Sequence, residues 1–423
     1  MRPPPSSTPA PASSPRARSA GATFAAFRTP NYRLYWSGLV LYVLGQRAEY
    51  VTFAWMVWEV TRDPLHLGYL GLAQGAPLVV FQLLGGVLAD RMSRLRLLLV
   101  TQSFTALTLS AAVALALLDR LGVGPLLALA ALSNAFRAFD EPARLAMIPQ
   151  LVDRERLPNA IALGSVPWQA GRMIGPSVTG VLIAAFGGTL GLALAAGASW
   201  GALALYGRLR IQAAAPSGDG RHPARQFVEG LSFVVHDVLF AGLIGLVLFN
   251  AVFGMSYITL LPVYADEYYQ SGSTGFGLLN AAHGVGAFAG TLTFATAAHR
   301  IARPGTTLLA TAAAMGLILV AFAVSPALWV GFTTLLLVGF ANTFYLTQVS
   351  TFVQQHVPDR LRGRVLAIYS LCWNLMPLGG LMAGVLAAAV DARFAVVVGG
   401  VMVTANALLM LTSRRLRAAG AIG

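Results

Sequence analysis

The chain has 423 residues, of which 57% are hydrophobic and 11% are charged, and its mean hydropathy is +0.68. Because a soluble globular domain carries about 25% charged residues, this composition excludes a soluble protein. The formal net charge of +13 is due to arginines, which lie between the apolar runs rather than on one face of a domain. This distribution argues against a nucleic-acid partner. The single cysteine, Cys372, excludes a disulfide or a cysteine-based metal site within the chain.

Residues 1–30 are rich in proline, serine and alanine, and we expect them to form a disordered cytoplasmic tail. They contain no apolar core of the kind that a cleaved signal peptide needs. The first apolar run begins near Trp36 and is too long for such a core.

Long apolar stretches then recur along almost the whole chain, each close to the roughly 20 residues that a helix needs to cross a bilayer. They predict an all-α polytopic membrane protein with twelve transmembrane helices in two pseudo-symmetric six-helix bundles, over 31–209 and 239–413. The expected spans are 35–60, 66–89, 95–117, 124–147, 160–186, 188–209, 239–264, 274–298, 305–324, 326–352, 363–389 and 393–413.

The arginines between the spans predict the orientation. Alternate connections and both tails (1–30 and 414–423) hold most of them, whereas the other connections hold only Arg62, Arg120 and Arg393, beside several acids. The positive-inside rule therefore places both termini in the cytoplasm, and an even number of spans requires the same. All basic residues are arginine, which is typical of a GC-rich bacterial genome, so we expect a bacterial cytoplasmic membrane.

The longest interior connection, 210–238, starts polar and ends in QFVEGLSFVVHD, where Phe227, Leu231 and Val234 fall at helical spacing. This pattern favours a cytoplasmic interfacial helix that links the two bundles. The alternative is a simple extension of the following span.

The two halves resemble each other weakly. Gln74 precedes Asp90 by 16 residues, and His283 precedes His299 by the same interval. In addition, LVDRERLPNAIA (151–162) resembles HVPDRLRGRVLA (356–367). Two parallel six-span halves are a transporter plan that places the substrate near the membrane midplane, between the halves.

Four ionisable residues lie in or near the membrane without obvious contact with solvent, namely Arg47, Glu49, Arg172 and His283. Ionisable side chains at such depth usually face a cavity or a partner. Glu49 and Arg172 lie about 20 Å and about 18 Å from the cytoplasmic ends of their spans, so they share a depth. We hypothesise that Glu49 faces the central cavity, pairs with Arg172 when ionised and carries a proton. The alternative is a fixed structural ion pair.

Two further features of the spans have a functional and a structural interpretation. His283 is a candidate titrating group, although a lone membrane histidine more often hydrogen-bonds across a helix interface. In span 5, which reads GRMIGPSVTG, Gly171, Gly175 and Gly180 would let a neighbouring backbone approach closely. Pro176 removes a helical hydrogen bond and can kink the same span.

Several stretches resemble the major facilitator superfamily. GGVLADRMSR resembles its signature between spans 2 and 3, with Ser93 in place of the second glycine, and matches it at Gly86, Leu88, Asp90, Arg91 and Arg94. The span 5 stretch resembles the motif of its proton-driven exporters, with only Gly180 of the usual paired glycines at its end. FDEPARLAMIPQLVDRERLPNAIAL, RMIGPSVTG and VPDRLRGRVLAIYSLCWNLMPLGGLMAG look like the narrower enterobactin-exporter and macrolide and multidrug efflux group, and this resemblance covers about residues 28–412.

The resemblance implies a proton-coupled exporter that works by alternating access, driven by the proton gradient and without a cofactor. Asp90 would engage the cytoplasmic end of span 11, while Arg91 and Arg94 would hold neighbouring spans, so that the inner side closes. A carboxylate is favourable at a helix N-terminus. The rest of this charged latch is expected to consist of Arg137, Asp140, Glu141 and Arg144. His299 replaces the acid in the second half, which predicts an asymmetric gate.

Polar and aromatic residues of the spans would line a roomy substrate cavity. The candidates are Gln46, Arg47, Gln74, Trp168, Gln169, Asn250, Asn280, His283, Asn342, Tyr345, Gln348, Trp373 and Asn374. Such a cavity suits small amphipathic molecules, either drugs or siderophore-like compounds. Siderophore export would favour several cavity arginines for an anionic cargo, and only Arg47 and Arg172 are available.

Two other functions remain as alternatives. One is a lysophospholipid flippase or importer, and the other is a non-transporting membrane scaffold or sensor, which would need a sizeable folded soluble domain that the sequence lacks. An enzyme is not expected, since the chain has no H-E-x-x-H motif and no phosphate loop. The expected partners are membrane lipid, a small-molecule substrate and protons, and we expect a monomer.

Overall fold

The computed structural model describes residues 24–91, 93–211, 223–413 and 417, which contain helices and no strand. Residues 1–23 of the predicted N-terminal tail and most of the predicted C-terminal tail lie outside the described residues. The helices of the first half are η1 (Ala25–Arg28), α2 (Pro30–Thr61), α3 (Pro64–Arg91), α4 (Arg94–Leu117), α5 (Val123–Arg137), α6 (Asp140–Leu151), η2 (Arg154–Arg156), α7 (Leu157–Phe186) and α8 (Gly188–Tyr206).

The second half is helical in the same way, and one of its long segments contains a π-helical turn, η3, and ends in a second one, η4. Its helices are α9 (Pro223–His236), α10 (Val238–Phe249), η3 (Asn250–Gly254), α11 (Tyr257–Val263), η4 (Tyr264–Tyr268), α12 (Gly272–Ala297), η5 (Ala298–Arg300), α13 (Pro304–Ala323), α14 (Leu328–His356), α15 (Asp359–Trp373), α16 (Met376–Ala389) and α17 (Ala392–Leu411).

Within the described ranges, seven helical segments are long and apolar enough to cross a membrane. They include Arg94–Leu117 and the continuous Val238–Tyr268, whose mean hydropathy is 2.3. Many large apolar side chains on the outside of the molecule are exposed, such as Leu117, Trp329 and Leu409. Exposed apolar side chains over so much of the surface suit a protein whose surroundings are lipid rather than water.

Local sequence explains where several helices begin and end. Gly187 has a φ of 82°, a conformation that glycine adopts without steric cost, and it ends α7 and allows an abrupt turn into α8. Asp237 caps α10, because its Oδ1 accepts hydrogen bonds from the backbone N–H groups of Leu239 at 2.9 Å and Phe240 at 3.4 Å.

The cap at Asp237 also separates α9 from α10, so α9 is a helix of its own rather than an extension of the following span. Glu229 of α9 forms an ion pair of 2.6 Å with Arg364 of α15, and Val234 is buried against the apolar core of the second half. Val235 on the other side of the helix is 64% exposed. The helix therefore lies on the end of the second half.

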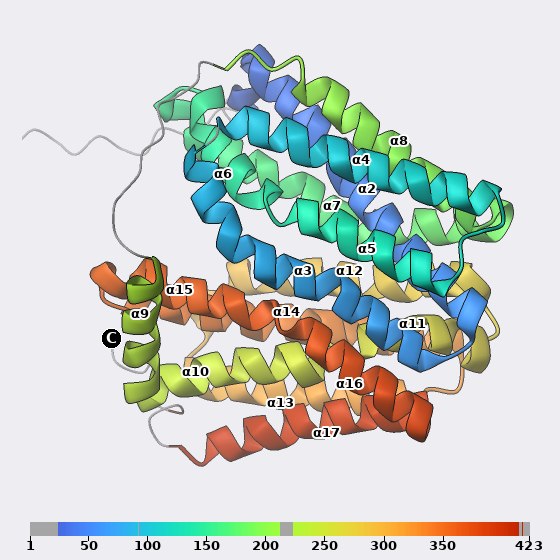
Figure 1. Cartoon of the computed structure of the whole chain (residues 1–423). Helices are drawn as coiled ribbons and strands as arrows, with labels where there is room; N and C mark the ends of the chain where they lie inside the picture. Colours follow the sequence, from blue (N-terminus) through green and yellow to red (C-terminus); the bar gives the residue numbers. More distant parts are fainter. Residues whose placement is uncertain (1–23, 92, 212–222, 414–416, 418–423) are drawn as a thin grey trace, which may run out of the picture.

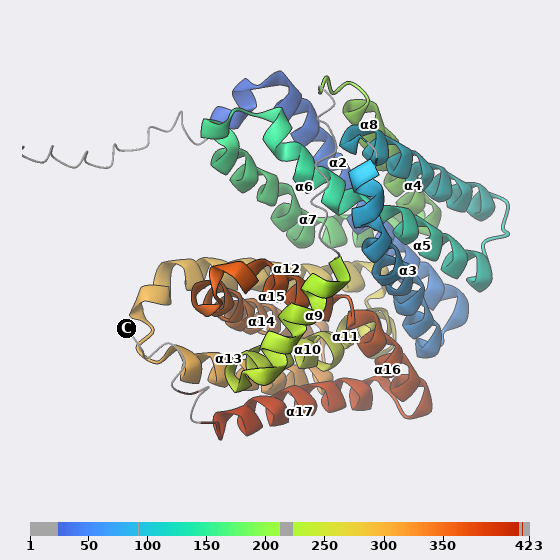
Figure 2. The same ribbon diagram turned by 60° about the vertical axis from the view of Figure 1, so that its left-hand side comes forward.

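The two halves are joined at one end of the molecule. In Figure 1 the helices α2–α8 and α10–α17 form two groups that meet at the end opposite α9 and diverge toward α9. Figure 2 shows the same divergence from another side. The helices α7 and α12 pack together, as do α3 and α16. These two helix pairs connect the groups.

The apolar cores follow the same division. One buried cluster includes residues of both groups, such as Trp55 and Phe276, whose rings stack with centroids 6.3 Å apart. Two other clusters lie within single groups: one contains Tyr32 and Tyr206, and the other contains Phe240 and Val353. The groups thus share a core at one end and have separate cores at the α9 end.

Candidate substrate cavity and buried charges

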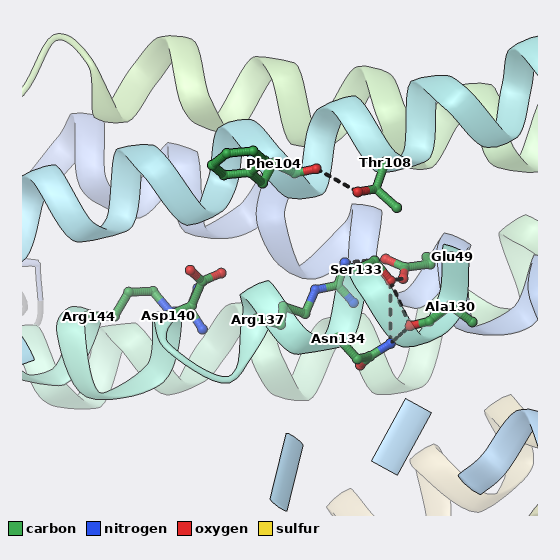
Figure 3. Close-up of polar contacts among 9 residues, drawn as sticks. All are labelled: Glu49, Phe104, Thr108, Ala130, Ser133, Asn134, Arg137, Asp140 and Arg144. Atoms are coloured by element: carbon green, nitrogen blue, oxygen red, sulfur yellow. Dashed lines mark hydrogen bonds and ion pairs between the residues drawn. The ribbon is translucent and has the colours of Figure 1, made fainter. Parts of the chain in front are cut away.

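Glu49 lies in the middle of α2, and only 1% of its side chain is exposed. Its Oε1 accepts a hydrogen bond of 2.6 Å from the Ser133 hydroxyl, and its Oε2 forms an ion pair with Arg137. Figure 3 shows Ser133 and Arg137 directed from α5 toward this carboxylate. They are four residues apart and therefore share one face of the helix. The buried negative charge of Glu49 is thus compensated by two neighbours.

The predicted ion pair between Glu49 and Arg172 is wrong in this conformation, because the carboxylate is bound to Arg137. The resemblance assigned Arg137 to the charged latch, although the expected span 124–147 contains this residue. In the structure α5 and α6 together cover 123–151, so Arg137 lies near the middle of this segment, at the depth of Glu49. A short break at Ala138 and Phe139, rather than the end of the span, follows Arg137.

A second buried charge pair lies one helical turn beyond, on α6. The Asp140 carboxylate accepts a hydrogen bond from the Thr101 hydroxyl of α4, and its Oδ2 lies 3.5 Å from Arg144 Nη1. The Arg144 guanidinium also lies over the Tyr42 ring, 3.9 Å from its centroid, which is an attractive cation–π geometry. Asp140 and Arg144 therefore contact each other and connect α6 to α4 and α2.

Half of the predicted gate residues fall where side chains are not described. The side chains of Gly86, Asp90, Arg91 and Glu141 lie outside the described residues. Arg94 is the first residue of α4. The gate therefore stays a prediction, except that Arg137, Asp140 and Arg144 form the interior pairs given above.

A cavity of about 500 Å³ lies beside these charges, within the first helix group. The described residues that line it are Tyr42, Gln46, Arg47, Glu49, Tyr50, Gln74, Leu78, Asn134, Arg137, Arg144, Trp168 and Arg172. Six of the predicted cavity and coupling residues are thus together, from α2, α3 and α7: Gln46, Arg47, Glu49, Gln74, Trp168 and Arg172. The lining also contains four arginines and one carboxylate, so it is more basic than the sequence indicated.

The four arginines differ in their partners. Arg137 is matched by Glu49 and Arg144 by Asp140, whereas no ion pair with a carboxylate is found for Arg47 or Arg172 among the described residues. The Arg47 Nε is buried and has no hydrogen-bond partner in this part of the chain. Two positive charges of the cavity wall therefore remain uncompensated by the protein.

An apolar compartment of about 230 Å³ adjoins the basic cavity and shares Tyr50, Gln74, Leu78 and Asn134 with it. Its other described lining residues come from both helix groups: Ala54, Leu67, Leu70, Gly71, Gly75, Ile258, Thr259, Trp373, Asn374, Met376 and Pro377. The predicted cavity residues Trp373 and Asn374 lie here. The two compartments together have one basic end and one apolar end.

The remaining predicted cavity residues lie elsewhere. Asn280 donates a hydrogen bond of 3.0 Å to the Phe276 carbonyl of its own helix, and Tyr345 is buried in the core of the second group. Gln348 lines a separate cavity of about 380 Å³ between α10, α12, α13 and α14. Gln169, Asn250 and Asn342 line neither central compartment. Their sequence positions gave no information on which helix face turns inward.

His283 of α12 contacts a residue of a neighbouring helix, as the structural interpretation of this histidine predicts. Its Nδ1 lies 2.7 Å from the Tyr257 hydroxyl of α11. The residue lines neither of the two central compartments.

The glycines of the span 5 motif are at close helix contacts, as the sequence predicts. A Cβ on Gly175 would lie 2.7 Å from Arg47 Cβ, and one on Gly171 would overlap Val43. Gly180 contacts the other helix group, since a Cβ there would lie 2.9 Å from the Gly277 Cα. The motif therefore brings α7 against α2 near Arg47 and against α12 farther along.

Several residues of the site were missed from the sequence, above all Ser133, Thr101, Tyr42, Tyr50 and Asn134. The spacing of Ser133 and Arg137 was the available signal, because it places a hydroxyl and a guanidinium on one helix face. Aromatic residues such as Tyr42 and Tyr50 gave no signal, since nothing in the sequence distinguishes them from the other tyrosines of the spans.

A helical multi-pass membrane protein with a polar cavity walled by several helices has the architecture of a transporter. The profile of the family described as transmembrane secretion effector matches residues 21–421. The chain is 28% identical over 354 residues to the multidrug efflux pump Tap of Mycolicibacterium fortuitum, covering 81% of this chain and 86% of that protein. It is 27% identical over 314 residues to the enterobactin exporter EntS of Citrobacter koseri, covering 74% of each.

Among solved structures, a bacterial homologue of the human lysosomal transporter Spinster, in an inward-facing and unoccupied conformation, superposes with a TM-score of 0.73. Its sequence identity is 16%, and the match covers 92% of this chain and 98% of that chain, so the likeness concerns the fold. The chain belongs to the transmembrane secretion effector family of the major facilitator superfamily and is a membrane transporter.

Proposed function

We propose that the protein is a proton-coupled exporter of small amphipathic molecules in the bacterial cytoplasmic membrane. In this proposal twelve transmembrane helices form two six-helix bundles, over 31–209 and 239–413, and both termini and α9 are cytoplasmic. No cofactor takes part, and the chain works as a monomer. The efflux pump and the siderophore exporter among its relatives support export as the direction.

The observation that carries the proton-coupling proposal is the position of Glu49. It is the one carboxylate among the described residues that line the basic cavity, and it is almost fully buried. A buried carboxylate is expensive when it is ionised without a partner, and Arg137 and Ser133 remove that cost. Protonation of Glu49 breaks the ion pair and frees Arg137, so the proton changes the contact between α2 and α5.

This arrangement fits one stage of an alternating-access cycle. The two groups share a core at the end opposite α9 and are separate at the α9 end, so the conformation is open toward the cytoplasm in the proposed orientation. Glu49 bound to Arg137 is then the state after the proton has been released to the inside. The outward-open state would receive the next proton on the same carboxylate.

The test is transport into inside-out vesicles with an acidic interior, measured with ethidium, 1-naphthoate and oleoyl lysophosphatidic acid as probes. Wild-type protein should accumulate at least one of them only while the pH gradient exists, and Glu49→Gln should abolish the dependence on the gradient. An unchanged rate of gradient-driven accumulation in Glu49→Gln would remove Glu49 as the proton carrier. Accumulation of no probe by the wild type would count against export of amphipathic molecules.

A further inference from the structure

The charge of the cavity wall points to the class of molecule that is transported. Arg47 of α2 and Arg172 of α7 line the same cavity. The Arg47 side chain lies against Gly171 and Gly175 of α7. Gly171 directly precedes Arg172, and Gly175 follows it by three residues. The motif glycines thus hold one arginine beside the other.

Two like charges at this depth are costly unless an anion neutralises them. The protein supplies anions to the other two arginines of the wall, through Glu49 and Asp140, but the described residues supply none to Arg47 or Arg172. The Arg47 Nε, buried and without a hydrogen-bond partner in that part of the chain, is a donor directed at no protein acceptor. A ligand with an acidic group would neutralise the two arginines and would accept a hydrogen bond from the Arg47 Nε.

The adjoining compartment indicates the rest of the ligand. Tyr50 and Gln74 line both compartments, and beyond them the wall is formed mainly by apolar side chains such as Leu67, Ile258 and Pro377, with the Trp373 ring. A molecule that spans the two compartments therefore needs an acidic end and an apolar body. Ionised Glu49 would not repel the acid strongly, because Arg137 neutralises it.

We propose that the transported molecule is an anionic amphiphile whose acidic group binds between Arg47 and Arg172 and whose apolar part lies in the compartment lined by Trp373. The inference rests on the proposed transport function and narrows its substrate. A guanidinium binds a carboxylate or a phosphate through paired hydrogen bonds, so both a soluble aromatic acid and an anionic lysolipid have the required chemistry.

The test is equilibrium binding to the purified full-length protein at one pH, without a gradient. The probes are 1-naphthoic acid, 1-naphthamide and 1-naphthylmethylamine, which share a ring system and differ in charge. The acid should bind about tenfold more tightly than the amide, and the amine should bind most weakly. A second comparison, between the affinities for oleoyl lysophosphatidic acid and oleoylglycerol, shows whether the bound anion can be part of a lipid.

Variants identify the binding groups. Arg47→Gln and Arg172→Gln should each weaken binding of the acid about tenfold while the affinity for the amide changes less than about twofold. Arg120→Gln removes an exposed arginine outside the cavity and should leave all affinities unchanged. Trp373→Ala should weaken binding of the acid and of the amide equally, because the apolar compartment contacts the ring system that both probes share.

Equal affinities for acid and amide in the wild type, in both probe pairs, would overturn the inference, and so would a preference for the amine. Acid binding that persists in both arginine variants would also overturn it, and intact binding of the amide shows that those variants are folded. Failure of the proposed function looks different: the acid would bind as expected, but no probe would accumulate under a pH gradient.

Discussion

Arg62, at the end of α2, forms an ion pair with Asp266 in η4, and this contact joins the two helix groups at the end opposite α9. Trp58, one turn earlier, donates its indole N–H to the same carboxylate at 3.0 Å. Both interactions exist only while that end is closed. In the proposed orientation they form an external latch, and the sequence had shown Arg62 only as a charge of an outer connection.

Loss of this latch should shift the protein toward the outward-open state. Asp266→Ala removes the ion pair and the Trp58 hydrogen bond, which together contribute about 1–3 kcal/mol at a partly exposed site. With Cys372→Ser and Gln46→Cys, a membrane-impermeant maleimide applied from outside should label the cavity several times faster in Asp266→Ala. Asp63→Asn is the matched control, since Asp63 contacts His66 within the same half. Equal labelling rates in Asp266→Ala and its parent would contradict the latch.

The buried pair of Glu49 and Arg137 should contribute to stability as a unit. Arg137→Met leaves the Glu49 carboxylate buried with only Ser133, so we expect a loss of about 3–5 kcal/mol in the free energy of unfolding. Replacing both residues by apolar ones, Glu49→Leu with Arg137→Met, should recover most of that loss. The measurement is unfolding in mixed detergent micelles, and additive effects of the two substitutions would show that they do not interact.

Close contact between α7 and α12 should be needed for the closed external end. An alanine at position 180 would place its Cβ 2.9 Å from the Gly277 Cα, so Gly180→Ala forces the two helices apart. We expect a loss of about 1–3 kcal/mol in stability, together with slower transport. Gly164→Ala, on the same helix with no atom within 4 Å, is the control. If both variants transport at the wild-type rate, the contact is not needed.

The helical membrane fold could be predicted because apolar length is a property of local sequence. The bilayer sets the length of each helix, and Gly187 ends α7 at the predicted boundary between the spans 160–186 and 188–209. The contact of Gly180 was predictable for the same reason, since small residues in membrane helices are found where helices approach closely.

The partners of the buried charges could not be predicted in the same way. Depth alone favoured Arg172 as the partner of Glu49. The actual partner, Arg137, depends on how α2, α5 and α7 are rotated about their axes. Packing sets that rotation, as at Gly171 and Gly175, which place Arg47 rather than Glu49 against α7. The same rotation decides that Asn280 bonds to its own helix instead of lining the cavity.

The internal gate remains to be tested through Asp90, whose side chain lies outside the described residues. In the proposed cycle its carboxylate engages the N-terminal end of α15 when the cytoplasmic side is closed, an interaction of about 1–2 kcal/mol. Asp90→Asn should therefore enlarge the inward-open population by a factor of about 5–30 and slow transport accordingly. Arg96→Gln, in the same connection, should do neither, because Arg96 is expected only to hold this loop in the cytoplasm. Maleimide labelling of Gln46→Cys from the cytoplasmic side measures the population, and an unchanged rate with full transport in Asp90→Asn would remove Asp90 from the gate.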